Sequence, residues 1–106
     1  MKTITYHKLV RDKIPEIIEK AGKTCVWFTL SDEEYLKLLD EKLNEELAEY
    51  QESKDLEELA DLLEVMRAVA SARGSSMEDV EKSRIQKAEK RGGFEQKILL
   101  EKVIEE

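Results

Sequence analysis

Leucines recur at helical spacing through the middle of the chain, and this pattern constrains the fold more than any other feature. At about 100° per residue, one stripe falls within an arc of about 80° around a helix axis. Its members are Leu36, Leu39, Leu43, Leu47 and Tyr50. Residues 56–70 are apolar over more than half of a helix circumference, so several neighbours must cover that segment. The sequence therefore predicts two packed helices at the centre of the fold.

Capping signals and glycines predict four helices. Ser31 with Glu34, and Asp55 with Glu58, have the spacing of capping boxes, and Gly74 is a helix stop. The expected ranges are about 12–21, 31–53, 55–73 and 76–91. Residues 24–30 are β-branched and aromatic, which is typical of a short strand, and the tail after Phe94 could extend and pair with them. We expect an all-α fold with at most this minor strand pair.

The length of 106 residues predicts one helical domain that spans residues 1–106. The connection between the two central helices is short, so we expect them to form an antiparallel hairpin. A chain this small buries only about two thirds of its unfolded surface. A homodimer, or a higher homo-oligomer, is therefore expected, and two hairpins would complete a four-helix bundle.

Charge and composition exclude several classes of function. The chain is 41% charged with a formal net charge of −7, which disfavours binding to a nucleic-acid polymer. No apolar run approaches the ~20 residues that span a membrane, and the first residues contain no apolar signal core. The lone Cys25 cannot form an internal disulfide, as is typical of a reducing compartment. We expect a cytoplasmic protein without a membrane partner.

Two acidic pairs lie on the central helices, Glu46 with Glu49 and Glu58 with Asp61. Residues three apart share a helix face, and both pairs are within two turns of the hairpin loop. Four carboxylates at one end of a hairpin repel one another, and a divalent cation relieves that repulsion. All-oxygen ligation suits Mg²⁺ or Mn²⁺. Glu45 lies about 100° from Glu46 around the axis and is expected to face solvent.

The spacing alone leaves other interpretations open. A chain with 25 acidic residues contains pairs three apart by chance. Glu46 and Glu49 could line a solvated face, and Glu58 could act only as the third residue of a capping box.

Two groups of basic residues are candidates for binding phosphate. Lys8, Arg11 and Lys13 form a cluster at the start of the first predicted helix, and they could equally form an ordinary basic terminus. Lys87 and Arg91 share one face of the last predicted helix, where they could instead compensate the helix dipole.

Three separated motifs resemble one enzyme family. The run Glu45–Glu49, followed by Glu58–Asp61, resembles the EExxE…ExxD signature of all-α nucleotide pyrophosphohydrolases, which include the MazG-like proteins and phosphoribosyl-ATP pyrophosphohydrolase. The segments Tyr6–Pro15 and Lys87–Phe94 resemble a small MazG-like subfamily in particular. The spacer between the two acidic motifs is shorter than in most of the superfamily.

The resemblance implies Mg²⁺-dependent cleavage of nucleoside triphosphates, in particular noncanonical ones, to monophosphate and pyrophosphate. It implies that four carboxylates hold the metal: Glu46, Glu49, Glu58 and Asp61. Glu46 or Glu49 would also be the general base. The phosphates would bind to Lys8, Arg11, Lys13, Lys87 and Arg91. Two alternatives are phosphoribosyl-ATP hydrolysis and a non-enzymatic helical module whose acidic face binds a protein.

Overall fold

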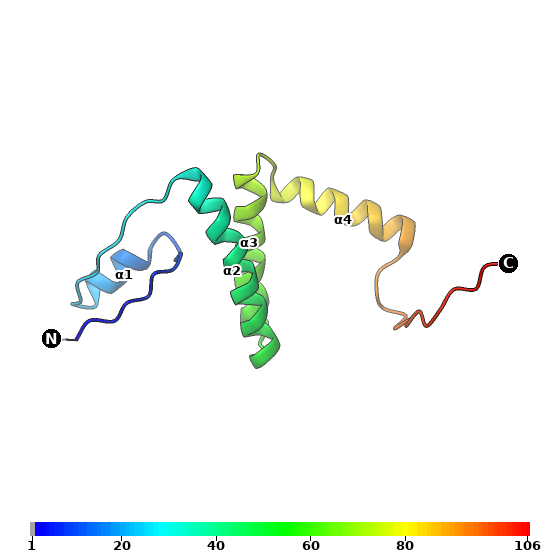
Figure 1. Ribbon diagram of the computed structural model, residues 1–106, viewed down its shortest axis with the longest axis horizontal. Coiled ribbons are helices and arrows are strands. Elements are labelled where there is room, and N and C mark those ends of the chain that lie inside the picture. The colour runs from blue at the N-terminus through cyan, green and yellow to red at the C-terminus, as the bar shows by residue number, and fades with distance from the viewer. Residues whose placement is uncertain (1) are drawn as a thin grey trace.

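A computed structural model describes residues 2–106 of the chain. This part contains four helices and no strand (Figure 1): α1 (Ile14–Lys20), α2 (Asp32–Ser53), α3 (Leu56–Ala72) and α4 (Met77–Arg91). The expected all-α class is confirmed, and each helix lies within two residues of its predicted range. The expected strand pair is not present in residues 2–106. Residues 24–30 and the tail lie at opposite ends of the molecule, because α4 leads the tail away from the other helices (Figure 1).

The two central helices pack along one another and run in opposite directions (Figure 1). Lys54 ends α2 in the left-handed conformation with φ 61°, and its N–H donates to the Tyr50 carbonyl at 2.7 Å. Asp55 follows at once as the N-cap of α3. The chain therefore reverses within two residues, which places the end of α2 beside the start of α3.

The two predicted capping boxes have different outcomes. The Ser31 hydroxyl accepts the Glu34 N–H at 3.2 Å, and this begins α2 as expected. The Asp55 side chain makes no cap hydrogen bond, and the Asp55 N–H donates to Ser53 Oγ at 3.1 Å. The capping interpretation of Glu58 is therefore wrong, because the N–H that its carboxylate would accept already has another partner.

The chain is far more open than a compact domain of its size. Its radius of gyration is 19.0 Å, whereas a compact chain of this length has about 13 Å. Its accessible surface is 10213 Å², against about 6,100 Å² for a folded monomer of this mass. Within residues 2–106 only Leu39 and Ala70 are buried apolar residues, and much of the apolar face of α3 is exposed. None of the helices in this part of the chain combines the length and apolarity needed to cross a membrane.

Replacing Ser31 by Ala should lower the free energy of unfolding by about 1 kcal/mol, because it removes the hydroxyl that caps α2. Asp55→Ala should cost clearly less, since the carboxylate makes no cap bond. Urea denaturation followed by circular dichroism, at one fixed protein concentration, measures both. An Asp55→Ala variant as unstable as Ser31→Ala would contradict this description of the two N-termini.

Candidate metal and phosphate site

Five carboxylates gather near the turn of the hairpin. Glu45, Glu46 and Glu49 come from the second half of α2, and Glu58 and Asp61 come from the first two turns of α3. One oxygen each from Glu46, Glu58 and Asp61 lie within 4.8 Å of one another. The same holds for Glu45, Glu46 and Glu49, so Glu46 belongs to both groups. We call these five residues the carboxylate cluster.

Glu46 is the centre of the carboxylate cluster. It is 7% exposed and is the one buried charged residue in the described part of the chain. Its Oε1 lies 3.5 Å from Lys42 Nζ, while its Oε2 is buried without a hydrogen-bond partner. An unpartnered buried carboxylate oxygen is costly unless something compensates it. A hard cation at Oε2 would supply that compensation, and the all-oxygen donors of the cluster fit Mg²⁺ or Mn²⁺.

The environment of the cluster shifts two acids in the same direction. Burial and the neighbouring Glu49 carboxylate raise the pKa of Glu46 above its ordinary value. Partial burial, followed by the charges of Glu49 and Asp61, raises the pKa of Glu58. Both shifts arise because negative charges are crowded where water is limited, and both would be relieved by a bound cation.

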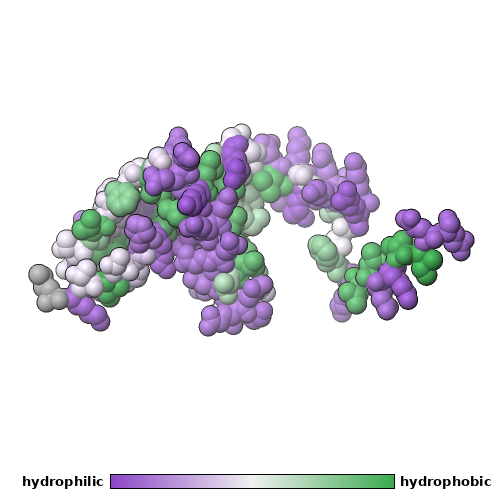
Figure 2. Space-filling model, viewed as in Figure 1, coloured by the Kyte–Doolittle hydropathy of each residue, from purple (hydrophilic) through white to green (hydrophobic). Residues whose placement is uncertain are grey.

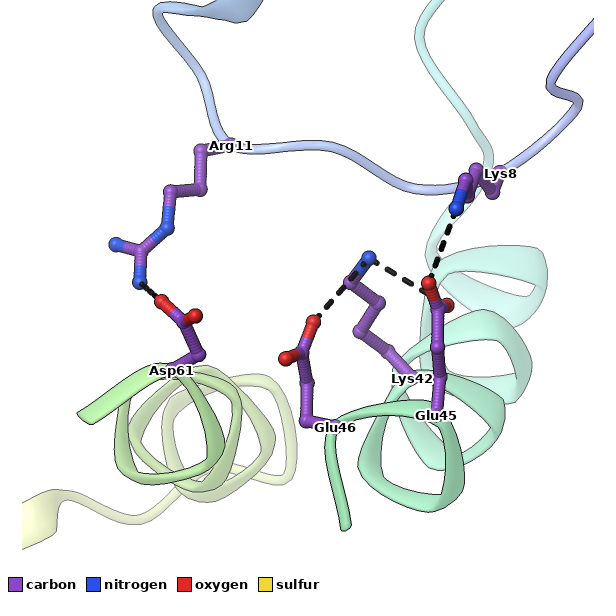
Figure 3. A network of polar contacts seen from close by, with 6 residues as sticks. All are labelled: Lys8, Arg11, Lys42, Glu45, Glu46 and Asp61. Atoms are coloured by element: carbon purple, nitrogen blue, oxygen red, sulfur yellow. Dashed lines mark hydrogen bonds and ion pairs between the residues drawn. The ribbon is translucent and has the colours of Figure 1, made fainter. Parts of the chain in front are cut away.

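The N-terminal segment brings two basic side chains onto the carboxylate cluster (Figure 3). Lys8 Nζ lies 3.1 Å from Glu45 Oε1, and Arg11 Nη2 lies 2.6 Å from Asp61 Oδ1. The hydrogen bond to Glu45 raises the pKa of Lys8. Burial works against ionisation of Glu45, but the hydrogen bond and charge of Lys8, together with Lys42, outweigh it and lower the pKa of Glu45.

The structure corrects the expected position of Glu45. Its side chain is half-buried and paired with Lys8 and Lys42, so it does not face solvent. Helical periodicity described only α2, and it contained no information about the N-terminal segment that lies over this side of the helix.

Lys42 belongs to the site and was not among the predicted site residues. Its Nζ lies 3.4 Å from Glu45 Oε2 and 3.5 Å from Glu46 Oε1. Its spacing of three and four residues from these acids was the signal that could have identified it.

The other predicted phosphate ligands are not at the carboxylate cluster within one chain. Lys13 is exposed, and no ion pair joins it to the cluster in residues 2–106. Lys87 and Arg91 are exposed on α4, which points away from the hairpin (Figure 1). One chain therefore unites the four predicted metal ligands with two of the five predicted phosphate ligands.

Comparison with known proteins adds little functional information. No family model matches the chain, and no solved structure matches it significantly. A stretch of 42 residues, 40% of this chain, is 60% identical to a protein of Mycolicibacterium smegmatis (strain ATCC 700084 / mc(2)155) that is described only as uncharacterized. The match covers 43% of that relative, so the similarity spans less than half of its length.

The raised pKa of Glu46 makes the stability of the metal-free protein depend on pH. The Glu46 carboxyl group binds its proton more tightly in the folded state than in the unfolded state. Protonation of Glu46 therefore stabilises the folded protein at low pH, and this contribution is lost as pH rises from about 4.5 through the pKa of Glu46 in the folded state. Glu46→Gln does not titrate and should therefore gain stability over wild type across that window.

The measurement is chemical denaturation of both proteins in EDTA from pH 4 to pH 8. Glu52→Gln, at an exposed position on the same helix, is the control and should follow wild type. A Glu46→Gln variant whose difference from wild type does not change with pH would contradict the described burial of Glu46.

Proposed function

We propose that this protein is a Mg²⁺-dependent nucleotide pyrophosphohydrolase that works in the cytoplasm. It would cleave noncanonical nucleoside triphosphates to monophosphate and pyrophosphate, the reaction implied by its resemblance to MazG-like proteins. The observation that supports this most directly is the buried, unpartnered Oε2 of Glu46 at the centre of five carboxylates. An arrangement of this kind is costly in a purely structural hairpin and useful in a site for a hard cation.

The proposed metal ligands are Glu46, Glu49, Glu58 and Asp61. When bound there, Mg²⁺, or Mn²⁺ in its place, would offset the negative charge of the triphosphate and would make a bound water more acidic. The two helices contribute two ligands each, and the short turn at Lys54 and Asp55 sets their separation. A rigid hairpin suits Mg²⁺, which tolerates little distortion of its ligand geometry.

The proposed general base is Glu46 or Glu49. The base takes a proton from water as the water oxygen bonds to the α-phosphorus. The bond from the α-phosphorus to the bridging oxygen breaks, and pyrophosphate leaves with that electron pair.

We assign the binding of the phosphates to Lys8 and Arg11. Both lie over the carboxylate cluster on one extended segment, where Lys8 pairs with Glu45 and Arg11 pairs with Asp61, one of the proposed metal ligands (Figure 3). When metal and triphosphate bind, the phosphate oxygens give both side chains a new anionic partner, and Arg11 can bind phosphate with two parallel hydrogen bonds.

The large exposed apolar surface favours a second candidate, a helical module that binds another protein. Such a module has no need of a divalent cation at Glu46. The response to metal therefore separates the two classes of function.

Saturating Mg²⁺ should raise the melting temperature of the protein, and EDTA should reverse this. At about 100 times its Kd, a ligand of the folded state stabilises it by about 2.7 kcal/mol. Glu58→Gln should lose the response while the metal-free protein stays folded, since Glu58 has no capping role. Differential scanning fluorimetry measures this, with Glu52→Gln as a matched control and Na⁺ at equal ionic strength. An unchanged melting curve in Mg²⁺ and in Mn²⁺ would refute the metal site.

Glu49→Gln and Asp61→Asn should abolish pyrophosphate release. Loss of a general base alone lowers kcat by about 10² to 10⁴ fold. Lys8→Ala should mainly raise KM, by about one to two decades, because it removes a charge-assisted hydrogen bond worth roughly 1.5–3 kcal/mol.

The assay is steady-state release of pyrophosphate across dITP, dUTP, the standard nucleotides and phosphoribosyl-ATP, with Glu52→Gln as the control. Preference for phosphoribosyl-ATP would select the alternative enzyme. Release that is absent for every substrate, in a protein that binds Mg²⁺, would refute the proposed reaction.

A further inference from the structure

We infer that the C-terminal arm, residues 94–104, crosses to a second copy of this chain and pairs there with residues 24–30. The exchange is reciprocal, so two copies bury two such pairings.

The C-terminal arm presents an apolar surface that no other segment of residues 2–106 covers. Six of its eleven residues are large and apolar, and each is between 70% and 97% exposed: Phe94, Ile98, Leu99, Leu100, Val103 and Ile104. Figure 2 shows this apolar surface at the end of the chain, away from the helices. Apolar surface in water is unfavourable by about 25 cal/mol per Å², so an arm of this composition favours a covered state.

Residues 24–30 offer a surface of the same kind. Val26 is 96% exposed, and Trp27 and Phe28 are also exposed. The backbone of this segment makes no backbone–backbone hydrogen bond in the described part of the chain, and neither does that of residues 98–104. Pairing of the two extended segments supplies hydrogen-bond partners for their backbone N–H and C=O groups, and it brings their apolar side chains together.

The geometry favours pairing between copies over pairing within one chain. The two segments lie at opposite ends of a molecule that is 70 Å long, separated by the hairpin of α2 and α3 (Figure 1). A two-fold axis along the hairpin carries the N-terminal end of one copy to the side where the arm of the other projects. A two-fold arrangement is also closed, so both pairings form at once and no filament grows.

The amount of exposed surface fits an obligate dimer. The chain exposes about 4,000 Å² more than a compact monomer of its mass. Obligate homodimer interfaces bury about 2,000–5,000 Å² or more in total, so an interface of that class has enough surface to draw on.

The net charges of two other parts of the chain support a second copy as the occupant. Residues 32–72 hold 14 acidic and 4 basic side chains, a formal net charge of −10. Residues 82–91, which lead into the arm, hold 5 basic and 1 acidic, a net charge of +4. An arm that crosses to a second copy brings Lys87 and Arg91 towards the partner's acidic hairpin, and their use as phosphate ligands there rests on the proposed function.

Disulfide trapping between two single-cysteine proteins tests the exchange. One protein carries Cys25→Ser with Val26→Cys, and the other carries Cys25→Ser with a cysteine at position 98, 99 or 100. A size tag on one of them makes the mixed product distinct on a non-reducing gel. We expect a mixed disulfide dimer for at least one arm position after mild oxidation. Ser53→Cys, at the hairpin turn, replaces the arm cysteine as the control and should give at least tenfold less product.

Light scattering of the unmodified chain and of Leu99→Ser completes the test. We expect about twice the 12.3 kDa chain mass, and about tenfold weaker association or more in Leu99→Ser. The arm makes no contribution to the helices, so circular dichroism should be unchanged in this variant.

A monomeric wild-type chain would overturn the inference. So would a variant with Cys25→Ser, Val26→Cys and Leu99→Cys that yields only a disulfide within one chain. These readouts require no enzymatic activity. Their failure is therefore distinguishable from failure of the proposed reaction.

Discussion

Burial of the Glu46 carboxylate is the constraint on which the rest of the site depends. Packing of α3 against α2 removes this side chain from water and leaves Oε2 without a partner. Burial of an unpartnered carboxylate oxygen costs free energy, and the neighbouring charges either lower or raise that cost. Lys42 lies within ion-pair distance of the other oxygen, and the remaining acids of the carboxylate cluster add repulsion that the protein alone does not offset. This cost is the reason why we propose a cation at the carboxylate cluster.

The N-terminal segment turns this acidic hairpin into a site with both signs of charge. Lys8 and Arg11 each meet a carboxylate from a different helix, Glu45 on α2 and Asp61 on α3. Most of these side chains remain partly exposed, so the ion pairs contribute little to stability and can rearrange when an anion arrives. The proposed division of labour follows from this geometry, with carboxylates below for the cation and basic groups above for phosphate.

The chain is open because one hairpin cannot cover its apolar surface, and for the same reason we expect a second copy as a partner. The chain has one hairpin, and a two-helix hairpin cannot cover an α3 that is apolar over more than half of its circumference. Leu39 and Ala70 are the buried apolar residues of the described part, while the arm and residues 24–30 remain uncovered. A second copy would supply the missing layer of the four-helix bundle and the missing cover for both extended segments.

The sequence by itself determined the local structure. Leucine spacing, the Ser31 cap and the glycine stops act over a few residues, so the four helices could be predicted nearly to their ends. The i,i+3 pairs also identified the four candidate metal ligands, because residues on one helix face stay together in any fold.

Only the tertiary structure decided which residues pack against each helix face. Glu45 became part of the site because Lys8, more than thirty residues away in sequence, lies over this side of α2, and no helical period contains that information. The predicted capping box at Asp55 did not form: Ser53 Oγ accepts the Asp55 N–H, and the Glu58 N–H donates to the Asp55 main-chain carbonyl and not to its side chain. The expected strand pair did not form within one chain, because α4 leaves the hairpin in a direction that carries the C-terminal tail far from residues 24–30. Contacts between segments far apart in sequence depend on how the helices are oriented, whereas the capping and periodicity rules describe one helix at a time.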